Sequence, residues 1–325
     1  MIFGIRERDA FASERHVVRQ LRFALSDDVF YREGNGEMTR EITVDSVKET
    51  IFNEVKSRVD EVRGRIDAAA RKSGRVGDDV LLVAVSKYAE PSDCVVEGFL
   101  RSGIFDLAEN RPQRLLEKVD VWRSSPYWKN PAAQIFPSSF DRKSSLEDKT
   151  LRWHFIGSLQ RNKVRRILPF VSLIHSVDSW KLLETIERIL SEEEEFALEP
   201  TVRRGEVLTP PFSSVVSVLL EVHISEDSTK QGFTTEEVLD VLPKTRLLKH
   251  VKVCGLMGMA GLKTAPCETR RQFATLRQTL EKCRETFPEL VDLKELSMGM
   301  SGDFEIAIEE GATITRLGSI LYPHE

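Results

Sequence analysis

The sequence predicts a single α/β domain folded as a (β/α)8 TIM barrel around a parallel sheet. Eight short apolar runs follow one another between residues 80 and 319, and helical patterns separate several of them. Most of these runs are apolar at successive positions, which is typical of parallel strands that helices cover on the outer face. Eight such units favour a closed barrel over an open doubly wound sheet.

A long amphipathic helix comes first, over residues 46–72. Its apolar residues recur at helical spacing and the pattern stops before Gly74; they are Ile51, Val55, Val59, Val62 and Ile66. Only "ILYPHE" follows the eighth apolar run. We therefore expect the helix at 46–72 to replace the helix that normally follows strand eight.

The eight strands are predicted in chain order from the apolar runs. They span residues 80–86, 104–110, 152–158, 172–179, 215–225, 251–260, 293–299 and 313–319. Helical patterns lie between them at 180–190, 235–245 and 270–283. Another helix is expected after strand seven, where Phe304, Ile306, Ala307 and Ile308 supply the apolar positions.

Three stretches fall outside this rhythm. Residues 1–45 are predicted to be an N-terminal extension of uncertain order, which leaves 46–325 for the barrel. Residues 122–150 and 191–214 are rich in Pro, Ser and charge without periodicity, so we predict two exposed insertions. The acidic run Glu192 to Glu195 is interpreted as a solvated helix end.

Composition excludes several classes of function. A formal net charge of -5 provides no basic face for nucleic acid, and no apolar run approaches the roughly 20 residues of a membrane-spanning helix. The four cysteines have no zinc-binding spacing and are interpreted as reduced thiols, two of them in the core. We expect a cytoplasmic protein. The arginine-rich N-terminus leaves a mitochondrial address as the alternative, although its acidic residues disfavour a transit peptide.

Lys87 ends the apolar run "LLVAVSK" and is the first candidate site residue. In a TIM barrel the chemistry lies at the C-terminal ends of the strands, so this ammonium group is expected to point inward at the mouth. Burial would lower its pKa from about 10.4, and an unprotonated amine can attack an aldehyde to form a Schiff base.

A phosphate site is predicted after strands seven and eight. "SMGMSGDF" places Gly299, Ser301 and Gly302 before a helix, and "RLGS" places Gly318 and Ser319 at the end of strand eight. Glycines allow close backbone approach to an anion, and these two loops commonly hold phosphate in such barrels.

A lysine and a phosphate cradle together fit a phosphorylated carbonyl compound, for which pyridoxal 5'-phosphate is a natural candidate. Arg316, two residues before Gly318, would point into the same mouth and could face the pyridine nitrogen. Because a guanidinium keeps its proton, it would leave that nitrogen unprotonated and weaken the electron sink of the ring.

The motifs "VAVSK", "EN", "WHFIGSLQRNK", "SVDS", "STKQGF", "GLM", "LSMGMSGDFEIAI" and "TRLGS" resemble, in this order, those of the pyridoxal phosphate homeostasis proteins. The likeness runs from about residue 47 to 322, apart from the two insertions. It implies a barrel like the N-terminal domain of alanine racemase, a fold-type III barrel, here without the C-terminal β domain because the chain ends at Glu325. It also implies a role in storing, buffering or delivering the cofactor, without established turnover.

The resemblance carries over to single residues. Lys87 would hold the internal aldimine, Arg316 would meet the ring nitrogen and Asn110 would lie beside the cofactor. Ser301, Gly318 and Ser319 would hold the phosphate, with Gly302 in the same loop, and Met298 is a cofactor-packing or core candidate. Three positions depart from the family pattern: Tyr88 replaces the usual threonine, Ala108 a glycine, and Gly302 an alanine.

Other polar residues near the strand ends receive plainer interpretations. His154 is expected to satisfy core hydrogen bonds, and Glu109 is expected to pair with a lysine or arginine. Lys230 is a candidate second anion contact, while Glu109 and Asp178 are weak acid–base candidates. No catalytic or metal-binding residue is predicted.

Three functions stay open: a pyridoxal phosphate carrier, an amino-acid racemase, and a lysine-dependent aldolase acting on a sugar phosphate. The carrier is favoured, since the racemase lacks a second base from a further domain and the aldolase lacks a convincing acid–base pair. Such a carrier is expected to be a monomer. Its expected partners are pyridoxal phosphate and the apo forms of enzymes that use this cofactor.

Overall fold

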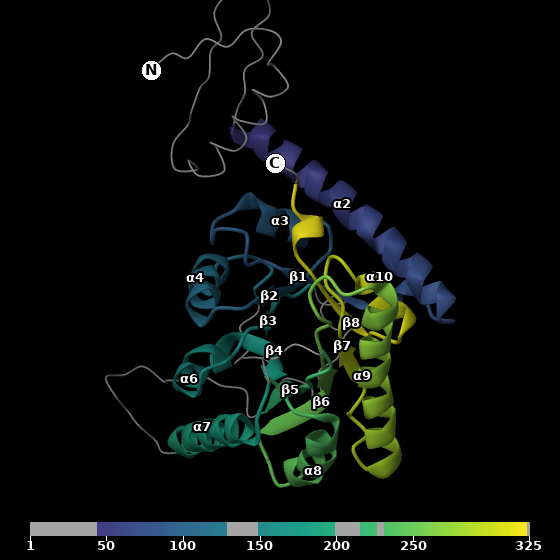
Figure 1. Cartoon of the computed structure of the whole chain (residues 1–325). Coiled ribbons are helices and arrows are strands. Elements are labelled where there is room, and N and C mark those ends of the chain that lie inside the picture. The colour runs from purple at the N-terminus through teal and green to yellow at the C-terminus, as the bar shows by residue number, and fades with distance from the viewer. Residues whose placement is uncertain (1–43, 129–148, 199–214, 226–230, 324–325) are drawn as a thin grey trace, which may run out of the picture.

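The computed structural model describes residues 44–128, 149–198, 215–225 and 231–323. Within them the eight predicted strands form a closed parallel barrel in which each strand pairs with the next and β8 returns to β1 (Figure 1). The strands are β1 (Leu81–Val85), β2 (Asp106–Glu109), β3 (Arg152–Phe155), β4 (Val171–Val177), β5 (Val216–Glu221), β6 (Val251–Met257), β7 (Glu295–Ser297) and β8 (Ile314–Leu317). All eight predicted strands are confirmed, and most end earlier than predicted because their last predicted residues form the loops of the mouth.

Helices surround this barrel (Figure 1). They are α2 (Val44–Lys72), α3 (Cys94–Arg101), α4 (Pro112–Trp122), α6 (Val164–Ile167), α7 (Trp180–Leu198), α8 (Thr235–Thr245), α9 (Pro266–Thr286) and α10 (Phe304–Glu309). Short 3-10 turns complete the described chain: η2 (Gly77–Asp79), η4 (Arg161–Lys163), η5 (Leu168–Phe170) and η6 (Ser319–Leu321).

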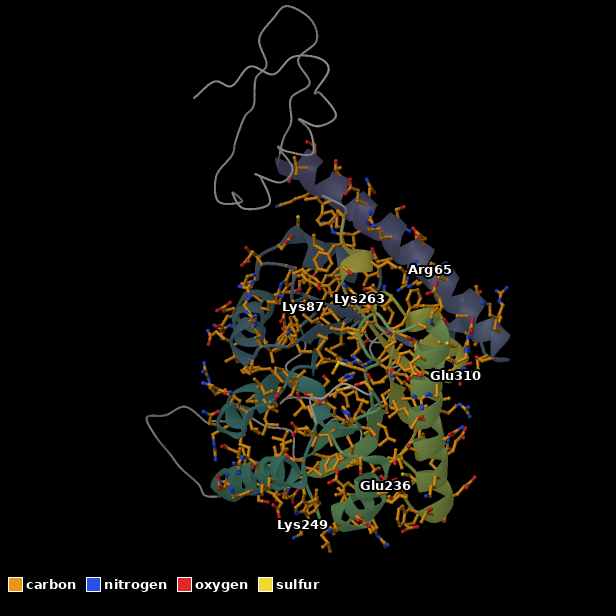
Figure 2. All side chains as sticks on the ribbon, in the orientation of Figure 1. Arg65, Lys87, Glu236, Lys249, Lys263 and Glu310 are labelled. Atoms are coloured by element: carbon orange, nitrogen blue, oxygen red, sulfur yellow. The ribbon has the colours of Figure 1, made fainter. Side chains whose placement is uncertain are left out.

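Helix α2 closes the ring of helices beside β8. It packs against α3 and α10, the helices that follow β1 and β7, so the prediction that it replaces the last helix of the barrel is confirmed (Figure 1). Arg65 on α2 pairs with Glu305 of α10 at 2.7 Å, and its guanidinium lies 4.8 Å from the Phe304 ring centre. Figure 2 shows Arg65 on α2 and Glu310 just beyond α10 on the same side of the molecule.

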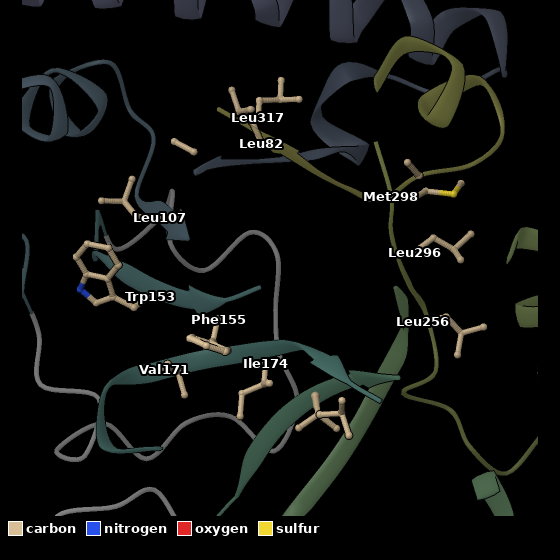
Figure 3. Close-up of a cluster of buried hydrophobic side chains, with 14 of the residues drawn as sticks. Leu82, Leu107, Trp153, Phe155, Val171, Ile174, Leu256, Leu296, Met298 and Leu317 are labelled. Atoms are coloured by element: carbon tan, nitrogen blue, oxygen red, sulfur yellow. The ribbon is translucent and has the colours of Figure 1, made fainter. Parts of the chain in front are cut away.

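Two hydrophobic clusters lie on opposite faces of the sheet. The larger fills the space between the strands and the helices and includes Leu82, Leu107, Trp153 and Phe155 (Figure 3). The smaller fills the barrel interior; its members are Leu81, Val83, Val85, Ala108, Leu173, Leu219, Cys254, Met257 and Ile314. Because side chains alternate between the two faces of a strand, these sets identify which residues near the mouth point inward.

The predicted domain limits need one correction. Helix α7 continues to Leu198, so the acidic residues from Glu192 lie within a helix and the second insertion cannot begin at 191. Glu192 pairs with Arg165 and Arg188, which explains why the run stays helical although it is acidic. Residues 1–43 of the predicted extension over 1–45 lie outside the described residues, and so do most residues of both insertions.

Three of the four cysteines are buried and Cys267 is exposed, so the core holds one cysteine more than expected, and these four cysteines form no disulfide bond with one another. In the described part of the chain, no helix combines the length and apolarity needed to cross a membrane.

Candidate functional site

Lys87 lies in a turn just beyond β1, at the C-terminal end of the barrel (labelled in Figure 2). Val83 and Val85 point into the barrel, but the alternation of β1 ends at Val85 and does not set the direction of the Lys87 side chain. The expectation of a buried amine is wrong, because the strand ends at Val85 and the Lys87 side chain is exposed in the turn. Its ammonium nitrogen lies 4.9 Å from the centre of the Tyr88 ring.

The predicted phosphate loops meet at Ser301. Its hydroxyl oxygen accepts hydrogen bonds from the backbone N–H groups of Gly318, at 3.2 Å, and Ile320, at 3.5 Å. Ser301 is half-buried, while Gly302 and Ser319 are exposed. The loops after β7 and β8 therefore bring a hydroxyl and backbone N–H groups together, and these are the types of donor that bind phosphate in proteins.

The glycines of these loops have different roles. Gly299 has a φ of +93°, and a Cβ there would lie 2.7 Å from the Ala307 Cβ, so this glycine allows the loop to pack on α10 and does not serve anion approach. A Cβ on Gly302 would meet nothing within 4 Å, which fits the alanine expected of the family. A Cβ on Gly318 would come within 3.1 Å of the Tyr88 ring.

Arg316 points into the barrel, since it lies two residues after the interior residue Ile314 on β8. It is buried, with 4 % of its surface exposed, and its guanidinium donates to the Ser297 hydroxyl at 2.5 Å and to the Gly258 carbonyl at 3.2 Å. Burial lowers the pKa of Arg316 to about 10, so it carries its charge at neutral pH.

A chain of buried hydrogen bonds continues from Ser297 across the barrel. Ser297 Oγ lies 2.8 Å from His175 Nδ1, His175 Nε2 lies 2.9 Å from His154 Nδ1, and His154 Nε2 lies 2.9 Å from Asp106 Oδ1. The expectation that His154 satisfies core hydrogen bonds is confirmed.

This chain has one consistent direction. Burial alone would raise the pKa of the Asp106 carboxyl, but Arg152 and His154 hold it well below its usual range, so Asp106 accepts. Burial lowers the pKa of both His154 and His175, and each neutral ring then donates through Nε2 and accepts through Nδ1. Every donor therefore points from Arg316 towards Asp106, and Ser297 can accept from Arg316 while it donates to His175.

Residues 146–325 match the family model of the alanine racemase N-terminal domain. The pyridoxal phosphate homeostasis protein of Aquifex aeolicus is 32% identical over 265 residues, which cover 82% of this chain and 96% of that protein. This chain belongs to the pyridoxal phosphate homeostasis protein family.

Two further relatives agree. The family member from Synechocystis is 33% identical over 75% of this chain and 90% of its own length. The solved structure of PipY from Synechococcus elongatus, described as having PLP bound, matches with a TM-score of 0.61 and 28% identity, over 83% of this chain and all of that one. The predicted family and the TIM barrel are both confirmed.

In this family member, Met298 takes the second of its two predicted positions, in the core. The Met298 side chain is completely buried in the outer cluster beside Leu296 (Figure 3), and it does not line the mouth. The physical reason is strand alternation: Ser297 points into the barrel, and its neighbour must point outward. Asn110, in contrast, is half-buried directly after β2, at the same end of the barrel as Lys87.

A buried ion pair near Lys87 joins Glu109, which was predicted to pair with a basic residue, to Lys118, which the sequence analysis did not name. Glu109 contacts the ammonium group of Lys118 on α4, and both side chains have 0% exposure. Lys118 also donates to the Ser86 carbonyl, and the Ser86 hydroxyl donates to Glu109 at 2.9 Å. The sequence signal was present, because Lys118 lies three residues after Leu115 on the apolar face of its helix.

Glu221 is the acidic residue that sequence reasoning missed. It ends β5 with 4% of its surface exposed, and its Oε2 has no hydrogen-bond partner among the described residues. Burial, followed by the negative charge of Asp178, raises the pKa of Glu221 to about 7. Asp178 follows β4 and is half-buried, and Lys230 lies outside the described residues.

Proposed function

We propose that this protein binds pyridoxal 5'-phosphate, holds it covalently through Lys87, and acts in its intracellular homeostasis by storing, buffering or delivering it. One observation carries the proposal: Lys87, the Ser301 cradle and Arg316 lie at or beyond β1, β7 and β8, three strands that are adjacent in the barrel. Family membership and the relatives' names support it.

The donor set fits the three parts of such a ligand. Ser301, Gly318 and Ser319 would hold the phosphate, with the exposed Gly302 leaving room beside it. The exposed amine of Lys87 is accessible to an incoming aldehyde. Arg316 would face the ring nitrogen, held in place by Ser297 and the Gly258 carbonyl.

Bound pyridoxal phosphate supplies an aldehyde and an electron-withdrawing ring. The residues here restrain the second property, because Arg316 stays protonated and donates, so the ring nitrogen it faces would accept a hydrogen bond and remain unprotonated. A site of this kind favours holding the cofactor over turning over amino acids. We therefore propose a binding protein without its own substrate and assign no catalytic residue.

Delivery requires recipients, which we propose to be apo forms of pyridoxal phosphate enzymes that meet a monomeric carrier in the cytoplasm. An exposed Lys87 supports exchange, since a recipient's competing amine can reach it. The lack of a disulfide bond among the four cysteines supports a reducing compartment.

The test is covalent labelling. Purified protein is titrated with pyridoxal phosphate while its visible absorption is followed, then reduced with borohydride and mapped by peptide mass spectrometry. We expect a pyridoxyl group on Lys87 and none in Lys87→Ala. Lys263→Ala, which removes another exposed loop lysine, is the control and should label as the wild type does. A label on a different lysine, or no absorption band, contradicts the proposal.

A further inference from the structure

Glu221 lies inside the barrel at the level of the mouth. It is the last residue of β5, and two residues earlier Leu219 belongs to the interior cluster. It also pairs in register with Met257, the last residue of β6 and another interior residue. Paired residues of neighbouring strands point to the same face, so both relations direct the Glu221 carboxyl inward.

The surroundings of this carboxyl are unusual for a buried acid. Such a group normally finds a cation or several donors, because an unpaired buried charge is costly. Glu221 has an unpartnered Oε2. The positive charge of Arg316 favours the charged form of Glu221, but the Arg316 guanidinium donates hydrogen bonds to Ser297 and to the Gly258 carbonyl.

The other titratable groups around Glu221 lie on the neighbouring strands β4 and β6 and on its own segment. On β4 and just after it lie His175, which is neutral and bonded within the buried chain, and Asp178, which repels the Glu221 charge. On β6, Cys254 fills the interior and Lys252 pairs with Asp292 at 2.7 Å. Beyond Glu221 on its own segment is His223, whose backbone N–H donates to Phe233.

We propose that Glu221 is a proton-linked residue of the ligand site, which takes up a proton from solvent when an anionic phosphorylated ligand enters the mouth. Two effects give the direction. The ligand's negative charge disfavours a second anion nearby, and its bulk removes water that would otherwise solvate the carboxylate. Both favour the neutral carboxylic acid, so the ligand binds the form in which Glu221 carries its proton.

The expected magnitude follows from the fraction of competent protein. With a pKa of about 7, Glu221 is largely protonated at pH 6 and about one-tenth protonated at pH 8. Affinity scales with that fraction. Dissociation constants of the wild type relative to Glu221→Gln should therefore increase about tenfold from pH 6 to pH 8. The ratio cancels ionisation of the ligand and of Lys87, which both proteins share.

This inference rests on the proposed function, and the experiment separates the two. Pyridoxal phosphate is titrated into wild type, Glu221→Gln and Glu295→Gln at pH 6, 7 and 8. Glu295 is a buried glutamate at the first position of β7, at the end of the strand away from the mouth, and it accepts a hydrogen bond from the Thr313 hydroxyl at 2.6 Å. The dissociation constant of Glu295→Gln should depend on pH as that of the wild type does. If the wild type fails to bind at all, the proposed function fails; binding with a constant ratio overturns only the role of Glu221.

Proton counting provides a second readout. Binding heats at pH 7 in two buffers of different ionisation enthalpy should show that the wild type takes up roughly half a proton more than Glu221→Gln. Equal uptake, or release of a proton, contradicts the inference. Should the variant fail to fold, the Glu221 carboxyl is titrated directly by NMR in wild-type protein carrying labelled glutamate, where the ligand is expected to raise its pKa and an unchanged or lowered pKa overturns the inference.

Discussion

Two glutamates end strands of the same barrel, and their surroundings are opposite. Glu109 at the end of β2 has its charge matched by Lys118 and a hydrogen bond from Ser86. Glu221 at the end of β5 is equally buried, but one of its oxygens has no partner among the described residues and a second acid, Asp178, lies near enough to repel it.

The difference distinguishes a charged residue that stabilises the fold from one whose protonation state can change when a ligand binds. The pair at Glu109 also involves the Ser86 carbonyl, so it holds the end of β1, the turn that carries Lys87, and the start of the β2 loop together. Glu221 has no ion pair of this kind among the described residues, and its carboxyl can respond to a ligand by changing its protonation state. Four substitutions test this contrast.

The largest effect is expected from Lys118→Met, which leaves Glu109 buried and unpaired. Such a loss typically costs about 3–5 kcal/mol, so the free energy of unfolding measured in urea should fall by that order. The double variant Lys118→Met with Glu109→Gln should recover much of it, because the stranded charge is gone. A loss below about 1 kcal/mol would show that the pair is not structural.

Glu221→Gln should do the opposite, and its effect should depend on pH. The folded state raises the pKa of this acid from 4.5 to about 7, so wild-type stability is full below about pH 4.5 and declines as pH rises through 7. The variant should be more stable than the wild type by about 3 kcal/mol at pH 8 and by less than about 1 kcal/mol at pH 5. Urea unfolding at both pH values measures this, and a pH-independent difference would contradict it.

Ser297→Ala tests the buried chain of hydrogen bonds from Arg316 to Asp106. The change leaves Arg316 and His175 without their shared hydroxyl, which should cost about 1–3 kcal/mol and weaken pyridoxal phosphate binding. Ser217→Ala, on a half-buried serine of β5, is the matched control. Equal stability of the two variants would mean that the chain does not hold Arg316 in place.

Tyr88→Thr should change stability least. Its ring is 58% exposed, stacks edge-on to Tyr322 at 5.6 Å and lies against Lys87, so the loss should stay under about 1 kcal/mol. Because the ring also lies beside Gly318, it partly covers the route between the amine and the phosphate cradle. Transfer of pyridoxal phosphate to an apo-enzyme should accelerate several-fold. The control is Leu247→Thr, at an exposed residue outside the mouth. An unchanged transfer rate in Tyr88→Thr would show that the Tyr88 ring does not cover this route.

Much of the fold could be predicted from the sequence, because strand and helix periodicity is local. The eight strands, the helix at α2 and its position beside β8 all followed from patterns within single segments. Lys87 and the phosphate loops followed from a second regularity, that the ends of parallel strands meet at one end of a barrel.

Failures occurred where a residue's role depends on the direction of its side chain. Sequence alone left Met298 either packing against the cofactor or in the core, and only the direction of its side chain places it in the outer core cluster. Lys118 was overlooked on a helix whose phase brings it inward beneath β1. The burial of Lys87 was overestimated because β1 ends two residues before it.

By itself the sequence determined the barrel, the family and the set of residues at its C-terminal end, since these depend on local periodicity and on short motifs. Only the tertiary structure decided which charges are satisfied. The hydrogen bonds from Arg316 to Asp106 join five strands. The surroundings that raise the pKa of Glu221 are formed by residues on or just after β4, β6 and β8. Electrostatic energies depend on distance in space and on burial, and neither can be read from separation along the chain.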